Sequence, residues 1–191
     1  GMAVGYDSTT DTVWLIGGYS DIGEKEQQIF SFQSGYIEQR TDIAVPAYYA
    51  GHAQSYSQID SFLYILDHGT RAIDRFNVQS VTFEQEYAFV PDDLDEVVSE
   101  YSSCLATFFD TTQSANYLAV ISGGNSNNVH ILNLNDNEWL DNVPSLNVPR
   151  LASACIAHDG WLYSIGGLNS SSDAFGEGGT GEICCECQEA S

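Results

Sequence analysis

The sequence predicts an all-β protein built from repeated antiparallel units. Short apolar runs alternate in polarity with a period of two and end at Asn, Asp, Gly or Pro, which is typical of strands rather than helices. Three of these runs stop at a glycine pair: residues 13–18 (VWLIGG), 117–124 (YLAVISGG) and 161–167 (WLYSIGG). The last two pairs, ending at Gly124 and Gly167, are 43 residues apart, a spacing found in repeat proteins.

The clearest copy of the unit spans residues 123–167. After the glycine pair comes a strand-like run, VHILNL (129–134), and a polar turn that ends at Trp139. The segment VPSLNVPR then leads to Arg150, followed by a strand of small residues, ASACIA (152–157), the turn HDG and the run LYSIGG. This order predicts a four-stranded antiparallel meander.

The first two copies are looser. After Gly17 and Gly18 the first contains a strand-like run at 29–32, Tyr36 near the expected Trp position, and small residues at 50–55 before the run 62–66. The second keeps only Gly69 of its pair, and its remaining elements are a run at 73–78 and Phe83 at the Trp-like position.

The small-residue strands of the third and fourth copies are residues 102–109 and 152–157, in which Cys104 and Cys155 occupy equivalent positions. This equivalence supports the alignment of the copies. Because five cysteines without regular spacing do not indicate a disulfide framework, these two are interpreted as buried small apolar residues.

The order of glycine pair, strand, Asn-x-Trp, Pro-Ser-Leu, Pro-Arg, small-residue strand and Leu-Tyr-x-Ile-Gly-Gly resembles the kelch repeat. The resemblance is strong over residues 123–167 and degenerate elsewhere. It implies kelch-type four-stranded blades of a β-propeller. A single meander cannot bury both of its faces, so burial of the apolar residues also requires stacked blades.

The resemblance implies structural roles for the repeated residues. The glycine pairs are expected to permit the strand-end turns, and Trp139, Tyr36 and Phe83 to fill the space between neighbouring blades. Arg150 is expected to pair with a backbone carbonyl or an acidic group. The glycines concerned are Gly17, Gly18, Gly123, Gly124, Gly166 and Gly167.

About four blades are predicted, in one propeller region covering residues 1–191. Their bounds are about 1–45, 46–95, 96–147 and 148–191, and the last is incomplete because one strand-like run follows Gly167. Three alternatives stay open: a part of a larger propeller, a ring completed by another copy of the chain, or a closed four-bladed ring.

Composition limits the partners. Five Lys and Arg face 27 Asp and Glu, a formal net charge of −22, which argues against binding nucleic acid or an anionic membrane surface. No apolar stretch approaches the roughly 18 residues needed for a membrane span, so no membrane insertion is predicted. A partner protein with a basic surface suits this charge.

No motif for a catalytic nucleophile, a phosphate loop or a dinucleotide site occurs in the sequence. We therefore predict no catalytic residues, no cofactor and no metal site. The cluster Cys184, Cys185 and Cys187 supplies three thiols, one fewer than a tetrahedral zinc site requires. A disulfide elsewhere or reduced thiols are the favoured interpretations of this cluster.

The resemblance to kelch propellers, together with the absence of a catalytic motif, implies a non-catalytic protein-binding or scaffold module that uses the loops between blades. The acidic insertion at 90–100 is such a loop, with some helical character, and its Asp92, Asp93, Asp95 and Glu96 are the predicted contacts for a basic partner. Two alternatives are a sugar-active or sugar-binding propeller, similar to kelch-like oxidases and mutarotases, and a structural protein that self-associates.

Overall fold

The protein is described by a computed structural model that is all-β: its described residues form fifteen strands in four antiparallel sheets and contain no helix. None of them could therefore form a membrane-spanning helix. The structure describes residues 2–18, 27–46, 56–67, 70–91, 103–121, 127–149 and 153–167, and the backbone of 182–186.

Each sheet is an antiparallel meander made from one stretch of chain. The first contains β1 (Ala3–Asp7), β2 (Thr12–Ile16), β3 (Ile29–Gln33) and β4 (Tyr36–Gln39), in that spatial order. The second contains β5 (Tyr56–Ile59), β6 (Phe62–Asp67), β7 (Ala72–Asn77) and β8 (Thr82–Phe89). The strands pair with their neighbours in sequence, as hairpin connections require.

The third sheet follows the same order, with β9 (Cys104–Asp110), β10 (Ala115–Ile121), β11 (Val129–Asn133) and the two-residue β12 (Glu138–Trp139). The fourth has three strands, β13 (Ala154–His158), β14 (Trp161–Ile165) and β15 (Glu182–Glu186). The described structure therefore consists of three four-stranded sheets and one three-stranded sheet.

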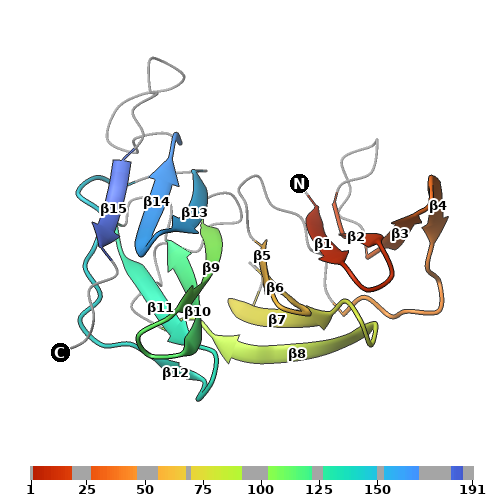
Figure 1. Ribbon diagram of the computed structural model, residues 1–191, viewed down its shortest axis with the longest axis horizontal. Helices are drawn as coiled ribbons and strands as arrows, with labels where there is room; N and C mark the ends of the chain where they lie inside the picture. The colour runs from red at the N-terminus through yellow and green to blue at the C-terminus, as the bar shows by residue number, and fades with distance from the viewer. Residues whose placement is uncertain are drawn as a thin grey trace.

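The four sheets lie beside one another in chain order, with the first and the last at opposite ends of the molecule (Figure 1). Contacts between neighbouring sheets are made largely by their first strands: β1 lies against β5, β5 against β9, and β9 against β13. We call these four the inner strands. They form a continuous row that links all four sheets.

Three apolar clusters fill the spaces between the sheets. Trp14 and Ile16 of the first sheet pack against Leu63 and Phe76 of the second, and all four are buried. A second cluster joins β6 and β7 to the third sheet, and a third joins the third sheet to the fourth. Because the residues of a strand alternate between its faces, each internal sheet contributes one face to each of two clusters.

Three different kinds of interaction connect the inner strands. The side-chain amide of Gln58 on β5 bonds to the backbone of Tyr6 on β1. Ser57 on β5 bonds through its Oγ to the hydroxyl and the backbone N–H of Thr107 on β9, each at 2.9 Å. A disulfide connects Cys104 on β9 to Cys155 on β13, whose Cα atoms are 5.9 Å apart.

The disulfide corrects the interpretation of Cys104 and Cys155 as buried small apolar residues that are not part of a disulfide. Both residues are buried, as expected, but their equivalent positions on adjacent inner strands bring the two side chains within bonding range. The aligned positions of Cys104 and Cys155 in two copies of the repeat therefore also indicated the disulfide.

Glycine conformation matters at the strand ends. Gly17 and Gly18 have φ of 71° and 109°, and Gly166 and Gly167 have φ of 71° and 78°, values that glycine alone adopts without steric cost. A different constraint acts at Gly5 on β1, where a Cβ atom would lie only 3.1 Å from Val78. The first two sheets approach closely because this position has no side chain.

The expected inter-blade aromatics differ in their surroundings. Trp139 is half-buried against the cluster between the second and third sheets, and the Phe83 ring lies 4.7 Å from that of Phe76. The prediction for Tyr36 is wrong, because its side chain is 80% exposed. Tyr36 begins β4, an outermost strand whose residues are all exposed, so no neighbouring sheet reaches it.

Candidate binding site

A pocket of about 480 Å³ lies between the third and fourth sheets. One wall is the end of β9 and the turn that follows it, residues 107–112. The opposite wall is the β13–β14 hairpin, residues 157–161. The pocket therefore lies at the end of two adjacent inner strands, where two turns far apart in sequence come together.

The wall on the third sheet combines an aromatic ring and a carboxylate. Strand alternation puts Phe108 and Asp110 on the face of β9 that carries Cys104, the face turned toward the fourth sheet. The ring of Phe108 stacks on Tyr117 with centroids 5.3 Å apart and an interplanar angle of 21°. This stacking fixes the ring beside the pocket.

Asp110 is held by the turn that it begins. Its Oδ1 accepts hydrogen bonds from the backbone N–H groups of Thr112, at 2.7 Å, and Gln113, at 3.3 Å. Such Asx turns are a preferred role for aspartate. Burial raises the pKa of Tyr117, and the charges of Asp110 and Asp136 raise it further.

The wall on the fourth sheet is a two-residue hairpin turn. His158 pairs with Trp161 across the hairpin, and the two residues between them, Asp159 and Gly160, both have positive φ, 51° and 79°. This is the backbone of a type I′ turn, for which Asp-Gly is a preferred sequence. The turn presents Asp159 at the pocket rim with an exposed side chain.

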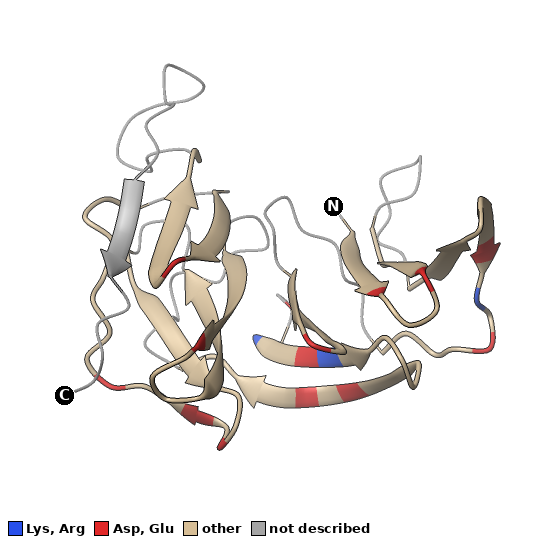
Figure 2. Cartoon of the chain, viewed as in Figure 1, with Lys and Arg blue, Asp and Glu red and all other residues tan. Residues whose placement is uncertain are grey.

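The lining contains two acids and one histidine. Asp110 and Asp159 belong to it, and no Lys or Arg does. Among the described residues no Lys occurs, and the three Arg residues lie in the second sheet and in the segment after β4, whereas acidic residues are found throughout (Figure 2). Within the described residues, the third and fourth sheets that form the pocket thus contain acidic side chains and no Lys or Arg.

Arg40 and Arg75 have acidic and aromatic partners of their own. Arg40 makes two hydrogen bonds to Asp42, at 2.9 and 2.7 Å, which lowers the pKa of that carboxyl. Arg75 pairs with Glu84 at 2.6 Å and lies 4.5 and 4.1 Å from the ring centroids of Phe62 and Tyr87.

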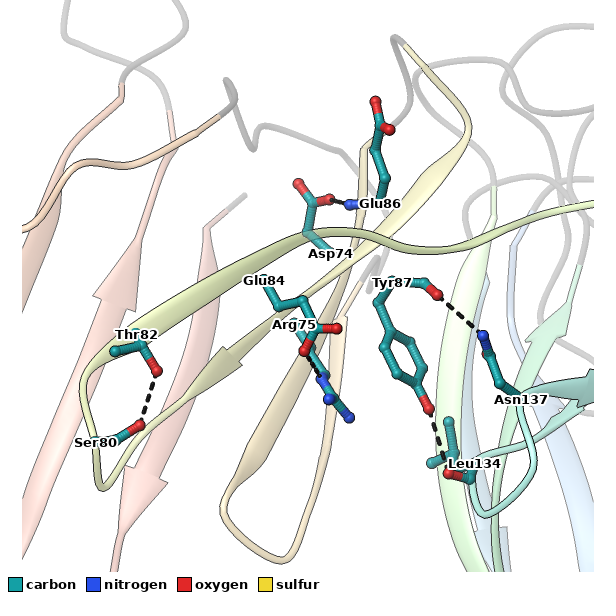
Figure 3. A network of polar contacts seen from close by, with 9 residues as sticks. All are labelled: Asp74, Arg75, Ser80, Thr82, Glu84, Glu86, Tyr87, Leu134 and Asn137. Atoms are coloured by element: carbon teal, nitrogen blue, oxygen red, sulfur yellow. Dashed lines mark hydrogen bonds and ion pairs between the residues drawn. The ribbon is translucent and has the colours of Figure 1, made fainter.

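Arg75 belongs to a polar network at the junction of the second and third sheets (Figure 3). There Tyr87 donates its hydroxyl to the carbonyl of Leu134, at 3.2 Å, while its own carbonyl accepts from Asn137. Buried Asp74 accepts the N–H of Glu86 at 2.6 Å, where the β7–β8 register shifts. The hydrogen bonds of Tyr87 to Leu134 and Asn137 join the two sheets, whereas the bond between Asp74 and Glu86 lies within the second sheet.

Most of the predicted site residues cannot be placed relative to the pocket, because they lie outside the described residues. Asp92, Asp93, Asp95 and Glu96 lie outside the described residues, as do Gly123, Gly124, Arg150 and Cys187. Backbone alone is described for Cys184 and Cys185. Among the side chains that the structure describes, no three His, Cys, Asp or Glu are grouped as a metal site would require.

Sequence reasoning did not identify the pocket. Its two acids were each visible as turn residues, in Asp110-Thr-Thr and Asp159-Gly160. Their proximity depends on the packing of two sheets, for which the alignment of 102–109 with 152–157 was the available signal. Aligned strands place their following turns at the same end, so aligned turn acids are candidates for one site.

The chain was also compared with known proteins. No protein-family model matches it, and a search of curated proteins finds no significant match. The resemblance to the kelch repeat therefore depends on the sequence motifs themselves.

Proposed function

We propose that this chain forms kelch-type blades of a β-propeller and acts as a non-catalytic binding module for a protein with a basic surface. Four consecutive meanders with a continuous row of inner strands support the architecture. The order of glycine pair, Asn-x-Trp, Pro-Arg and small-residue strand supports the kelch assignment. The pocket between the third and fourth sheets is the proposed contact.

The observation that carries the binding proposal is the pairing of carboxylates with aromatic residues in a lining without Lys or Arg. A Lys or Arg side chain entering the pocket would find the carboxylates of Asp110 and Asp159 and the face or edge of an aromatic ring. Charge-assisted hydrogen bonds and cation–π contacts both favour such a group. The net charge of −22 would accelerate the encounter.

A pair of decapeptides tests this proposal. One contains a single central Arg in a neutral sequence, and the other has citrulline, which keeps the shape without the charge. Calorimetric titration should detect binding of the Arg peptide that weakens as salt increases, because screening reduces the attraction. Citrulline should weaken binding about tenfold, a typical loss for one charge-assisted contact.

Two variants locate the binding. Asp110→Asn combined with Asp159→Asn removes both charges, while Asn keeps the turn acceptor and tolerates positive φ. Asp136→Asn is the matched control, because this acid lies in another turn of the third sheet and accepts from Asn133 and Glu138. Equal affinity for the double variant and the control would place the binding outside the pocket.

A sugar ligand is the second candidate. Phe108, Phe109 and Trp161 occur in the lining together with Thr111 and Thr112, and sugars combine apolar faces with hydroxyl groups. Binding of a neutral methyl glycoside should be nearly independent of salt, in contrast to binding of the Arg peptide. Titration with methyl glycosides at two ionic strengths separates the two candidates.

A further inference from the structure

The first sheet has an apolar face that the rest of the described chain does not cover. Its other face, which carries Trp14 and Ile16, packs against the second sheet. Strand alternation and pairing put six apolar residues together on the opposite side. We call this the leading face: Val4, Val13, Leu15, Phe30, Phe32 and Ile37.

Exposure shows that the leading face is accessible. Phe32 and Ile37 are 39% and 67% exposed, and the other four residues are half-buried. Phe32 pairs with Val13 on one side and with Ile37 on the other, so the apolar surface continues across three strands. A contiguous patch of this kind, unlike scattered apolar residues, indicates an interaction surface.

The last sheet has a corresponding face at the other end of the molecule. Cys155 and Leu162 point toward the third sheet, which leaves Ala154, Ile156, Tyr163 and Ile165 on the outer side, in the pairs Ala154–Ile165 and Ile156–Tyr163. We call these four residues the trailing face. Ile156 and Ile165 are 54% and 52% exposed.

The interfaces within the chain indicate what these faces fit. Each sheet packs one face against the following sheet in the chain, and this contact occurs three times. Trp14 and Ile16 of the first sheet pack against Leu63 of the second. In the same way, Tyr64 and Leu66 pack against Leu118 of the third sheet, and Ala106 packs against Cys155 and Leu162 of the fourth. The leading face of the first sheet and the trailing face of the last are the two sides of the described sheets left over from this series.

We propose that the leading face of one copy of this chain packs against the trailing face of a second copy, continuing the sheet-to-sheet series between molecules. The contact is heterologous, because two different surfaces meet. Neither defined face contains a charged side chain, so the contact would bury no unpaired charge. This inference is independent of the proposed binding of a basic partner.

The charge of the chain gives the association a distinctive salt dependence. Two copies with a formal charge of −22 each repel one another, and added salt screens this repulsion. Self-association should therefore strengthen with ionic strength, whereas binding of a basic partner should weaken. Sedimentation velocity at 20 and 500 mM NaCl, over a range of protein concentrations, measures this difference.

Two charge variants test the faces. Phe32→Glu alters the leading face and Ile165→Glu the trailing face, and each should reduce the association constant about 100-fold or more, because burial of an unpaired carboxylate is costly. Leu140→Glu is the matched control: Leu140 is also exposed, at 40%, but lies on neither face. Circular dichroism and thermal unfolding establish that each variant is folded.

Mixing the two variants decides whether the contact is heterologous. Phe32→Glu keeps an intact trailing face and Ile165→Glu an intact leading face, so a mixture should form a heterodimer although neither variant associates alone. Failure of the mixture to associate would overturn the proposal. A wild-type chain that stays monomeric at both salt concentrations would also overturn it, as would equal association by all three variants.

Discussion

The side-chain amide of Gln58 on the second sheet hydrogen-bonds to both backbone polar groups of Tyr6 on the first. Its Oε1 accepts the N–H of Tyr6 at 2.7 Å, and its Nε2 donates to the carbonyl oxygen at 2.7 Å. On the edge of β1 that does not face β2, this side chain thereby makes the hydrogen bonds that a further strand would make. The backbone N–H and carbonyl of Tyr6 are both satisfied as a result. The first two inner strands are joined through this amide.

Loss of the Gln58 amide should destabilise the fold. Gln58→Ala removes both bonds to Tyr6, and we expect a decrease of about 1–3 kcal/mol in the free energy of unfolding. Gln58→Glu keeps an acceptor for the N–H but cannot donate to the carbonyl, so it tests the two bonds separately. Urea unfolding measures the stability of both Gln58 variants, and Gln113→Ala, at an exposed glutamine, is the control. Equal stability of Gln58→Ala and this control would contradict the prediction.

The disulfide should contribute more than any single hydrogen bond. Cys104 and Cys155 are 51 residues apart, and closure of a loop of that length stabilises a fold by about 4 kcal/mol in the chain-entropy model. The double variant Cys104→Ala/Cys155→Ala should lose stability of this order in urea unfolding.

Reductant provides the control for the disulfide. It should destabilise the wild-type chain and leave the double alanine variant unchanged. Peptide mapping by mass spectrometry without reduction should recover the peptides of Cys104 and Cys155 as one linked species. Recovery of the two peptides unlinked from the oxidised protein would contradict the assignment.

Arg75 should matter more than its ion-pair partner. Its guanidinium lies over the rings of Phe62 and Tyr87, and cation–π contacts contribute about 0.5–1 kcal/mol each. The side chain of Glu84 is 53% exposed, where an ion pair contributes less than about 1 kcal/mol. Thermal unfolding should therefore rank Arg75→Ala below Glu84→Ala in stability. Equal stability of the two variants would show that the ion pair dominates, because both substitutions remove it.

Alkaline pH should destabilise the protein through Tyr64. Burial, together with a smaller effect of the nearby Tyr87, raises the pKa of this phenol from its ordinary value of 10 to about 12. Between pH 10 and 12 the unfolded chain releases the proton while the folded chain keeps it, so the free energy of unfolding falls as pH rises. The contribution is fully present below pH 10.

The matched variant for this effect is Tyr64→Phe, which keeps the ring and removes the titrating group. Urea unfolding at intervals between pH 8 and 12 should show a shallower decline for the variant than for the wild-type chain. The decline should not vanish, because burial also raises the pKa values of Tyr87 and Tyr117. Identical slopes would show that Tyr64 does not contribute.

Much of the strand content could be predicted because it depends on local pattern. The runs at 29–32 and 62–66 lie within β3 and β6, and the run at 129–134 contains β11. Alternating polarity and flanking turn residues are properties of a short segment, so a single sequence reveals them. The all-β class was confirmed for the same reason.

Features that depend on contacts between sheets were harder to predict. The small residues at 50–55, predicted as a strand, lie outside the described residues, and the first described strand of the second sheet is β5, which begins at Tyr56. Tyr36 matched an aromatic position of the repeat, but its burial depends on whether a neighbouring sheet reaches β4. The pocket likewise depends on two turns about 50 residues apart in sequence.

The unequal joints between the inner strands have a mechanical consequence. Hydrogen bonds connect β1 to β5 and β5 to β9, whereas a disulfide connects β9 to β13. When force is applied along the row of inner strands, the first two sheets are expected to separate from their neighbours first. The third and fourth sheets are expected to stay connected through the disulfide. Amide hydrogens of the first sheet should accordingly exchange with solvent sooner than those of β9 and β10, because opening at a breakable joint needs less free energy.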